Sequence, residues 1–261
     1  MSKNIITVHN DKIEIKNQNN EIIYYDNSTD IYNVITPGGT NSLILNNIPI
    51  PFSNIFPLSN SLLHLSLQLS KGNNFIIVCI RNPIERNLSY FYNIGNNPYK
   101  TYHPKFQTKK NNYQTQIINF SEKIINKSTN DTINLYFNTD IHSQFNEWFS
   151  EFFEITGINQ KIFNKTDGLD FYELPNNNKI MIYTYEKFDN NLSIFNKILR
   201  QNIITNINDI QEEYKEHYNN TKSQITYTQS YLDSQLNTDI MKFFYSDEDI
   251  QSFYNKYTIL N

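Results

Sequence analysis

Apolar and polar residues are arranged along the chain in blocks that predict a mixed α/β protein. The run F-I-I-V-C-I at residues 75–80 carries no charge and is typical of a central strand that is buried on both faces. Pro83 cannot continue a central strand but suits the first turn of a helix. Apolar residues then recur at helical spacing, at Ile84, Leu88, Phe91 and Tyr92. The stretch 75–93 is therefore predicted to form a strand, a sharp turn and a helix.

The remaining elements follow from the same two periodicities and from the turn residues between them. Short strands are expected at residues 5–8, 12–16, 21–25, 31–35 and 179–186, and an irregular or edge strand at 48–56. Helices are expected at about residues 61–71, 117–126, 141–153 and 190–201. A last helix is expected after Ser246, because the acidic residues that follow this serine favour a helix N-terminus.

Strands alternating with helical segments indicate an α/β protein. The chain has 261 residues, which is enough for one domain with a sizeable core. We therefore expect an N-terminal β-rich extension, a β meander, at residues 1–30. One α/β domain is expected at residues 31–261.

Composition narrows the classes of function. The net charge of −4 argues against a general nucleic-acid-binding protein. The single cysteine, Cys79, lies in the predicted central strand, so no intrachain disulfide can form and a buried thiol is expected. Neither a signal peptide nor a membrane-spanning run is apparent, which favours a soluble, cytoplasmic protein. No clustered His/Cys spacing indicates a metal site.

The turn after the central strand holds the clearest candidate chemistry. The chain has three arginines, and two of them, Arg81 and Arg86, lie in this turn. Guanidinium groups suit bidentate recognition of phosphate. Ser89 follows Arg81 by eight residues, about two helical turns into the helix, so the two side chains could hold one phosphate. The alternative is that Arg81 pairs with a carboxylate and Ser89 is a surface residue.

A second candidate lies after the predicted strand at residues 31–35. The turn Gly38-Gly39-Thr40-Asn41-Ser42 combines two glycines with hydroxyl and amide side chains before an apolar segment. Such a turn allows a close approach of backbone N–H groups to a phosphate. An ordinary β-turn is the alternative. The spacing and the lysine of a Walker loop are absent, which disfavours a P-loop kinase.

The segment R-N-P-I-E-R-N-L-S-Y-F-Y at residues 81–92 resembles the 3′-phosphate motif of sulfotransferases that use 3′-phosphoadenosine 5′-phosphosulfate (PAPS), and most of all the carbohydrate branch. The resemblance implies a three-layer, P-loop-like α/β sulfotransferase fold, with a central parallel sheet and helices on both of its faces. It implies that Arg81 and Ser89 hold the 3′-phosphate and that Arg86 has a structural role. It also implies that residues 38–42 hold the 5′-phosphosulfate, with Gly39 to Ser42 matching the family loop. No metal is implied; PAPS is the co-substrate and its product is 3′-phosphoadenosine 5′-phosphate (PAP).

Weaker sequence similarities to this family extend over residues 31–257. Parts of residues 154–171 and the ending F-F-Y-S-D-E-D-I at 243–250 are similar to proteins assigned to capsular polysaccharide synthesis. The implied acceptor is a carbohydrate hydroxyl. The basic, aromatic segment 99–113 could contact such an acceptor, although a solvated loop is the alternative. C-terminal segments help to close over the nucleotide in the wider superfamily, which makes Lys215, Lys222 and Tyr227 candidate contributors.

Two departures from the family pattern bear on activity. The family lysine of the 5′-phosphosulfate loop would fall at Pro37 or Gly38, and neither residue can replace a cation aimed at developing charge. Where relatives carry a general base, this chain has Ser53 and Asn54, so the catalytic residues are unknown; His64 is a candidate base or a structural histidine. The chain is therefore expected to be a PAPS-dependent sulfotransferase or, alternatively, a catalytically degenerate protein of that fold that binds a nucleotide or glycan without turnover.

Overall fold

The computed structural model describes residues 69–95, 123–198 and 212–258, together with the backbone of five strands before residue 59. The chain divides into two compact units. We call residues 1–80 and 155–205 the sheet unit, and residues 81–154 and 206–261 the helical unit. Each unit is described by itself.

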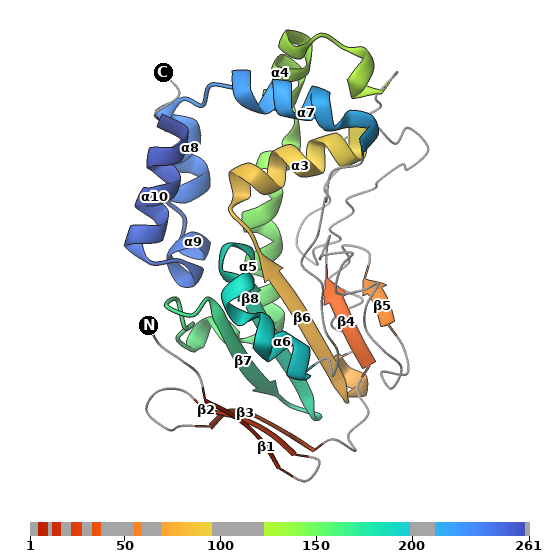
Figure 1. Ribbon diagram of the computed structural model, residues 1–261, viewed down its shortest axis with the longest axis vertical. Coiled ribbons are helices and arrows are strands. Elements are labelled where there is room, and N and C mark those ends of the chain that lie inside the picture. Colours follow the sequence, from red (N-terminus) through yellow and green to blue (C-terminus); the bar gives the residue numbers. More distant parts are fainter. Residues whose placement is uncertain are drawn as a thin grey trace. The chain divides into compact units, whose positions relative to one another are not determined.

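The sheet unit contains a five-stranded mixed sheet with the order β5-β4-β6-β8-β7 (Figure 1). The strands are β4 (Asn33–Pro37), β5 (Ile55–Leu58), β6 (Asn74–Ile80), β7 (Leu169–Leu174) and β8 (Asn178–Thr184). The pairs β4–β5, β4–β6 and β6–β8 are parallel, whereas β7 pairs antiparallel with β8. The irregular or edge strand expected at 48–56 overlaps the edge strand β5 only at residues 55–56, and β5 continues through Pro57 to Leu58.

The antiparallel edge corrects the expectation of a purely parallel sheet. Only residues 175–177 connect β7 to β8, and a connection this short can join antiparallel strands but not parallel ones. Asn176 and Asn177 both have left-handed backbone conformations, with φ of 61° and 54°. Consecutive residues with positive φ are typical of tight hairpin turns, and asparagine tolerates this conformation better than most residues.

A second sheet of three antiparallel strands comes earlier in the chain. It consists of β1 (Ile5–His9), β2 (Lys12–Lys16) and β3 (Ile22–Asn27), in the order β1-β2-β3. The β2–β3 register shifts between Ile15 and Lys16. Both sheets belong to the sheet unit, and the division of the chain at residue 30 stays a prediction.

The core of the sheet unit lies along β6 and β8. Almost every side chain of these two strands is buried, as expected for central strands covered on both faces. At the start of both strands, Oδ1 of Asn178 accepts hydrogen bonds from the backbone N–H and the side-chain amide of Asn74, at 3.2 and 2.7 Å. The rings of Tyr183 on β8 and of Phe188 after it pack against Phe195 on α6 (Leu192–Ile198). The apolar run at residues 75–80 is thus confirmed as a central strand.

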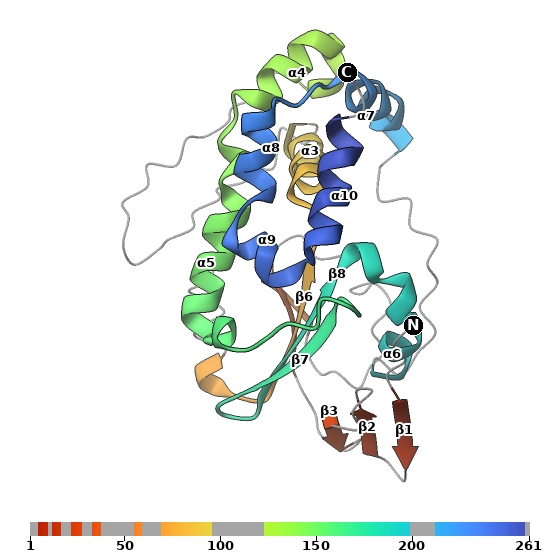
Figure 2. The same cartoon turned by 90° about the vertical axis from the view of Figure 1, so that its left-hand side faces the viewer.

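The helical unit contains seven described α-helices (Figure 2). They are α3 (Pro83–Gly95), α4 (Thr129–Phe137), α5 (Gln144–Thr156, whose last turn crosses into the sheet unit), α7 (Glu212–Gln224), α8 (Gln229–Leu236), α9 (Asp239–Phe244) and α10 (Asp247–Thr258). Ring contacts join the aromatic face of α5 to α9, where Phe149 and Phe153 lie 5.4 and 5.7 Å from Phe244. Tyr92 of α3 is fully buried.

The predicted helix ends are partly confirmed. Ser246 forms the expected N-cap of α10, because its Oγ accepts a hydrogen bond from the Asp249 N–H at 3.1 Å while Asp249 Oδ2 accepts one from the Ser246 N–H at 3.2 Å. The helix predicted at 117–126 is wrong in its described part, where residues 124–126 form a single 3₁₀ turn. The regular helix is instead α4, which begins after its N-cap Ser128.

Candidate functional site

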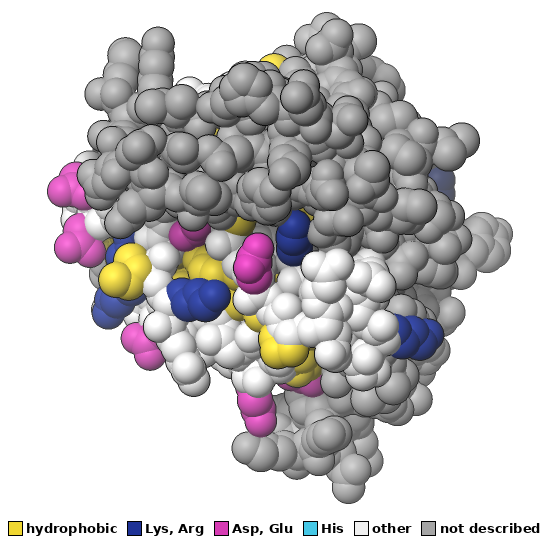
Figure 3. All heavy atoms as spheres, turned by 90° about the horizontal axis from the view of Figure 1, so that it is seen from below, with side chains coloured by type: hydrophobic (Ala, Val, Ile, Leu, Met, Phe, Trp, Pro, Cys, Tyr) yellow, Lys and Arg dark blue, Asp and Glu magenta, His cyan; other side chains and the backbone are white. Residues whose placement is uncertain are grey.

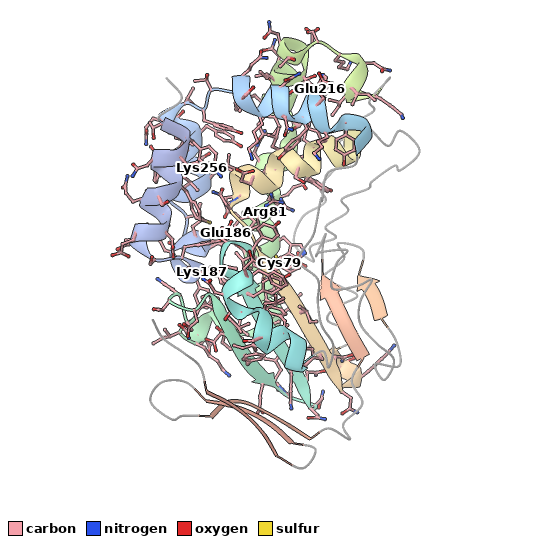
Figure 4. The ribbon with its side chains drawn as sticks, in the orientation of Figure 1. Cys79, Arg81, Glu186, Lys187, Glu216 and Lys256 are labelled. Atoms are coloured by element: carbon pink, nitrogen blue, oxygen red, sulfur yellow. The ribbon has the colours of Figure 1, made fainter. Side chains whose placement is uncertain are left out.

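The turn that carries Arg81 forms as its sequence predicts. β6 ends at Ile80, α3 begins at Pro83, and Asn82 between them closes the turn. The Asn82 side-chain oxygen accepts a hydrogen bond from the Ile84 N–H at 2.9 Å, and its backbone carbonyl accepts one from the Arg86 N–H at 3.0 Å. Asn82 therefore acts as the N-cap of α3 and Pro83 occupies the first helical position. Arg81 is left half-buried immediately before the helix (Figure 4).

Ser89 lies in the second turn of α3. It is half-buried, as are Arg86 and Tyr90, and these three residues form the least buried stripe of the described helix at spacings of three and four. Ser89 stands six residues after Pro83, which corresponds to roughly 9 Å along the helix axis. The structure thus places Arg81 immediately before α3 and Ser89 in its second turn. That they share one phosphate stays a prediction.

Arg86 has a structural environment, as the resemblance implied. Its Nη1 donates to the Asn87 side-chain oxygen at 3.1 Å, and its guanidinium lies 5.4 Å from the centre of the Tyr90 ring and 5.9 Å from that of Phe145. Burial lowers the pKa of Arg86, an effect that the Tyr90 hydroxyl partly opposes. Cation–π contacts with two rings anchor the arginine between α3 and α5.

Glu85 is the centre of an ionic cluster in the first turn of α3. Lys222 Nζ donates to its Oε2 at 2.8 Å, Lys256 Nζ donates to its Oε1 at 2.7 Å, and the Tyr257 hydroxyl donates to Oε1 at 3.2 Å. The Glu85 side chain is only 10% exposed. Burial raises its pKa, but the hydrogen bonds and charges of the two lysines outweigh that effect and bring the pKa to about 2. We call these four residues the Glu85 cluster.

The polar residues around the motif connect α3 to its neighbours in the helical unit. The Asn82 side-chain amide donates to the Tyr257 hydroxyl at 3.3 Å, which continues the chain of hydrogen bonds to Glu85. The Asn87 side-chain amide donates to Oε1 of Gln235 on α8 at 3.0 Å. These bonds join α3 to both α10 and α8.

Electrostatic effects relate Arg81 to the Glu85 cluster through Tyr218, a buried residue of α7. Burial, together with the negative charge of Glu85, raises the pKa of Tyr218 to about 12, and the positive charge of Arg81 opposes the rise. Both charges therefore act on one phenol. The buried hydroxyl stays neutral at physiological pH, so the charges in this region are those of the carboxylate and the cations.

The C-terminal candidates have different surroundings. Lys222 is held by Glu85 as described above. Tyr227 is buried and stacks on Tyr231 at 5.2 Å, which is the environment of a core residue. Lys215 lies on α7 and is half-buried. A role for any of them at the nucleotide remains a prediction.

The second candidate site lies outside the described residues. β4 ends at Pro37, whose Cα is paired with that of Leu58, and Gly38, Gly39, Thr40, Asn41 and Ser42 follow directly after it. Pro37 thus stands at the carboxyl end of a strand in the sheet, where α/β proteins bind ligands. Ser53, Asn54, His64 and the whole segment 99–113 also lie outside the described residues.

Sequence reasoning missed Glu85, Lys256 and Tyr257 as members of one cluster. Glu85 is typical of a carboxylate in a first helical turn, which alone predicts only an interaction with the helix dipole. Its partners lie 137 and 171 residues further along the chain. No local pattern identifies partners at such separations.

The described surface adds little to the site. On the face drawn in Figure 3, basic and acidic side chains are interspersed rather than gathered by sign. Within residues 69–95, 123–198 and 212–258 no three His, Cys, Asp or Glu side chains are grouped as a metal would require. Among the helices described, none combines the length and the apolar character needed to cross a membrane.

Comparison with known proteins identifies a protein family. The family described as "Sulfotransferase family" matches residues 51–258, which is well over half of the chain and includes both β6 and α3. No curated protein and no solved structure matches the chain.

Proposed function

The chain belongs to the sulfotransferase family, and from this premise we propose that it transfers a sulfuryl group from PAPS to a hydroxyl of a carbohydrate. The observation that carries the proposal is the turn between β6 and α3. It presents an arginine at the carboxyl end of a central strand, immediately before a capped helix. A cation and a helix N-terminus in this position suit the binding of an anionic phosphate.

Arg81 and Ser89 are proposed to bind the 3′-phosphate of the nucleotide. The guanidinium supplies parallel N–H donors for phosphate oxygens, and the hydroxyl supplies one more donor. Residues 38–42 are proposed to hold the 5′-phosphosulfate with backbone N–H groups. No metal is part of this proposal.

The reaction is a single in-line displacement. The acceptor hydroxyl oxygen forms a bond to sulfur while the bond between sulfur and the bridging oxygen of the 5′-phosphate breaks, and PAP leaves with that oxygen. The hydroxyl proton passes to a base, which we do not assign to a residue. The chain's part is to fix the nucleotide so that the sulfuryl group faces the acceptor.

The carbohydrate acceptor is proposed on the likeness of residues 154–171 and 243–250 to proteins assigned to capsular polysaccharide synthesis. Labelled PAPS and a panel of glycans test the proposal. Label is expected on a glycan with the wild type and not with Arg81→Ala, while Glu216→Gln, an exposed position on α7, should retain transfer. Transfer by Arg81→Ala at the wild-type rate contradicts the site assignment.

A second candidate is a degenerate protein of the same fold that binds the nucleotide without turnover. Pro37 favours it, because this residue ends β4 where the family loop would begin with a lysine. Loss of one group that stabilises developing charge costs about 3 kcal/mol of barrier, roughly a hundredfold in rate. PAP binding with no label transferred to any glycan supports this alternative.

A further inference from the structure

The Glu85 cluster carries more positive charge than an ion pair needs. One carboxylate receives two ammonium groups, at 2.8 and 2.7 Å, so the cluster has a net charge of +1. Because the pKa of Glu85 is about 2, the carboxylate is ionised throughout the physiological range. Arg81 adds a further positive charge four residues before Glu85, immediately ahead of the same helix.

The two lysine side chains contact the buried Glu85 carboxylate and are also partly exposed to solvent. The Lys222 side chain is 41% exposed and that of Lys256 is 54% exposed, whereas Glu85 is 10% exposed. Each ammonium carries three N–H donors. A ligand that approaches from solvent therefore meets ammonium groups whose positions the buried carboxylate fixes.

The lysines come from two helices that are distant in sequence from the motif. Lys222 is in the last turn of α7, and Lys256 is in the last turn of α10. The carboxylate that joins them stands in the first turn of α3, four residues after Arg81. Glu85 thus brings the last turns of two other helices of the helical unit to the start of the motif helix.

We propose that Glu85 is a positioning residue that holds the Lys222 and Lys256 ammonium groups near Arg81, where the three cations meet the 3′-phosphate of the nucleotide. The inference rests on the proposed function for the identity of the ligand. It differs from a purely electrostatic role, since replacing Glu85 by a neutral residue makes the region more positive. Positioning predicts weaker phosphate binding after that change, whereas net charge alone predicts tighter binding.

Calorimetric affinities for PAP, AMP and inorganic pyrophosphate test the proposal. The ratio of PAP to AMP affinity measures recognition of the 3′-phosphate, because AMP lacks that group, and a general loss of stability does not change this ratio. Glu85→Gln is expected to lower the ratio by about tenfold or more, the loss of one charge-assisted contact. Glu85→Asp keeps the negative charge and should therefore keep most of the wild-type ratio.

Glu216→Gln is the matched control, because it is the same substitution at an exposed position of α7. Figure 4 shows Glu216 and Lys256 at well-separated places in the helical unit. This variant should keep the wild-type ratio. Should Glu85→Gln fail to fold, Lys222→Met and Lys256→Met provide the test, since each is expected to lower the ratio with the carboxylate in place.

The outcomes separate this inference from the proposed function. If Glu85→Gln, or both lysine variants, bind PAP and AMP in the wild-type ratio, the inference is wrong while the nucleotide site stands. If the wild type binds PAP no better than AMP, the proposed nucleotide is wrong. In that case the affinity for pyrophosphate tests the cation cluster. An affinity that is about tenfold lower in Glu85→Gln than in the wild type, and unchanged in Glu216→Gln, supports the cluster. If Glu85→Gln binds pyrophosphate as tightly as the wild type, or if the wild type does not bind it, the inference is wrong.

Discussion

The Nζ atom of Lys256 lies 2.7 Å from Oε1 of Glu85, although 171 positions separate the two residues in the chain. The Nζ atom of Lys222, on a separate helix, lies 2.8 Å from the other carboxylate oxygen, Oε2. The motif helix α3 and the C-terminal helices α7 and α10 are therefore connected through one buried carboxylate. This connection makes the conformation of the motif dependent on the C-terminal part of the chain.

Removing the carboxylate is expected to destabilise the protein. Glu85→Ala leaves two ammonium groups facing one another without their counter-charge, and it removes the acceptor of the Tyr257 hydroxyl. We expect a loss of about 1–3 kcal/mol in the free energy of unfolding, less than for a fully buried pair because the lysines are half-exposed. Urea denaturation measures it, with Glu216→Ala as control. Equal stability of the two variants contradicts the structural role of Glu85.

The contribution of Glu85 to stability should depend on pH. Its pKa falls from 4.5 to about 2 on folding, so the stabilisation is fully present above pH 4.5 and is lost as the pH falls from 4.5 toward 2. The full effect corresponds to roughly 3 kcal/mol as an upper bound. The difference in unfolding free energy between wild type and Glu85→Gln should therefore shrink in acid.

Denaturation of both proteins at pH values from about 7 down to about 3 tests the direction of this pH dependence. In a Lys256→Met background, the part of this difference in unfolding free energy that depends on pH should be smaller, because one of the two cations that lower the pKa of Glu85 is gone. A difference that stays constant across this range shows that the charge of Glu85 contributes nothing.

A buried tyrosine in α3 provides an independent test of packing. The Tyr92 hydroxyl lies 2.7 Å from Nδ1 of His217 and 2.6 Å from Oγ1 of Thr221. Nε2 of His217 donates to the backbone carbonyl of Lys127 at 2.9 Å, so Nδ1 of the neutral ring accepts from the tyrosine. Tyr92→Phe leaves these partners unsatisfied and should cost about 1–3 kcal/mol in unfolding free energy.

Tyr254→Phe is the matched control for this substitution. Its hydroxyl donates to Oδ1 of Asp233 at 2.9 Å in an exposed position. Water can replace that bond, so the expected cost is about 0.5 kcal/mol or less. Chemical denaturation of both variants makes the comparison. A larger loss for Tyr254→Phe than for Tyr92→Phe would be inconsistent with the described core.

Two glycines of the sheet unit differ sharply in their surroundings. A Cβ atom at Gly168, which has a φ of +64°, would lie 2.2 Å from Oγ1 of Thr184 and 2.8 Å from Cδ of Lys187. A Cβ at Gly157, with a φ of +69°, meets nothing within 4 Å. Both alanine variants bear the strain of a left-handed backbone, about 1–2 kcal/mol, but only Gly168→Ala adds a steric clash.

Thermal and urea denaturation of the two variants give the test. Gly168→Ala should be less stable than Gly157→Ala by about 1 kcal/mol or more. Equal losses would mean that the residues around Gly168 move aside without cost, contrary to the packing of the turn after β8.

The strand, turn and helix from residue 74 to residue 95 could be predicted because every level of the sequence agrees there. The apolar run specifies a buried strand, Asn82 caps the helix, and Pro83 begins it. β7 was not anticipated as a strand: its sequence L-D-F-Y-E-L mixes charged and apolar residues, and its half-buried pattern results from its place at the sheet edge. Tertiary context, rather than local propensity, determined that element.

The candidate site was predicted only where its residues are local. Arg81 and Ser89 belong to one short motif and stand where the predicted turn and helix place them. The lysines that join Glu85 could not be assigned, because an exposed lysine on an amphipathic helix looks the same whether or not it has a distant partner. Three-dimensional packing alone identifies such a pair.

The most direct test of the central claim, that Arg81 marks a PAP(S)-binding site, is a thermal-shift titration of the wild type and Arg81→Ala with PAP, with AMP and ATP as controls. A ligand that binds the native state alone raises the melting temperature once its concentration passes its dissociation constant. We predict selective stabilisation of the wild type by PAP, with no such shift in Arg81→Ala. Equal shifts in both proteins, or no shift with PAP at millimolar concentration, would contradict the account.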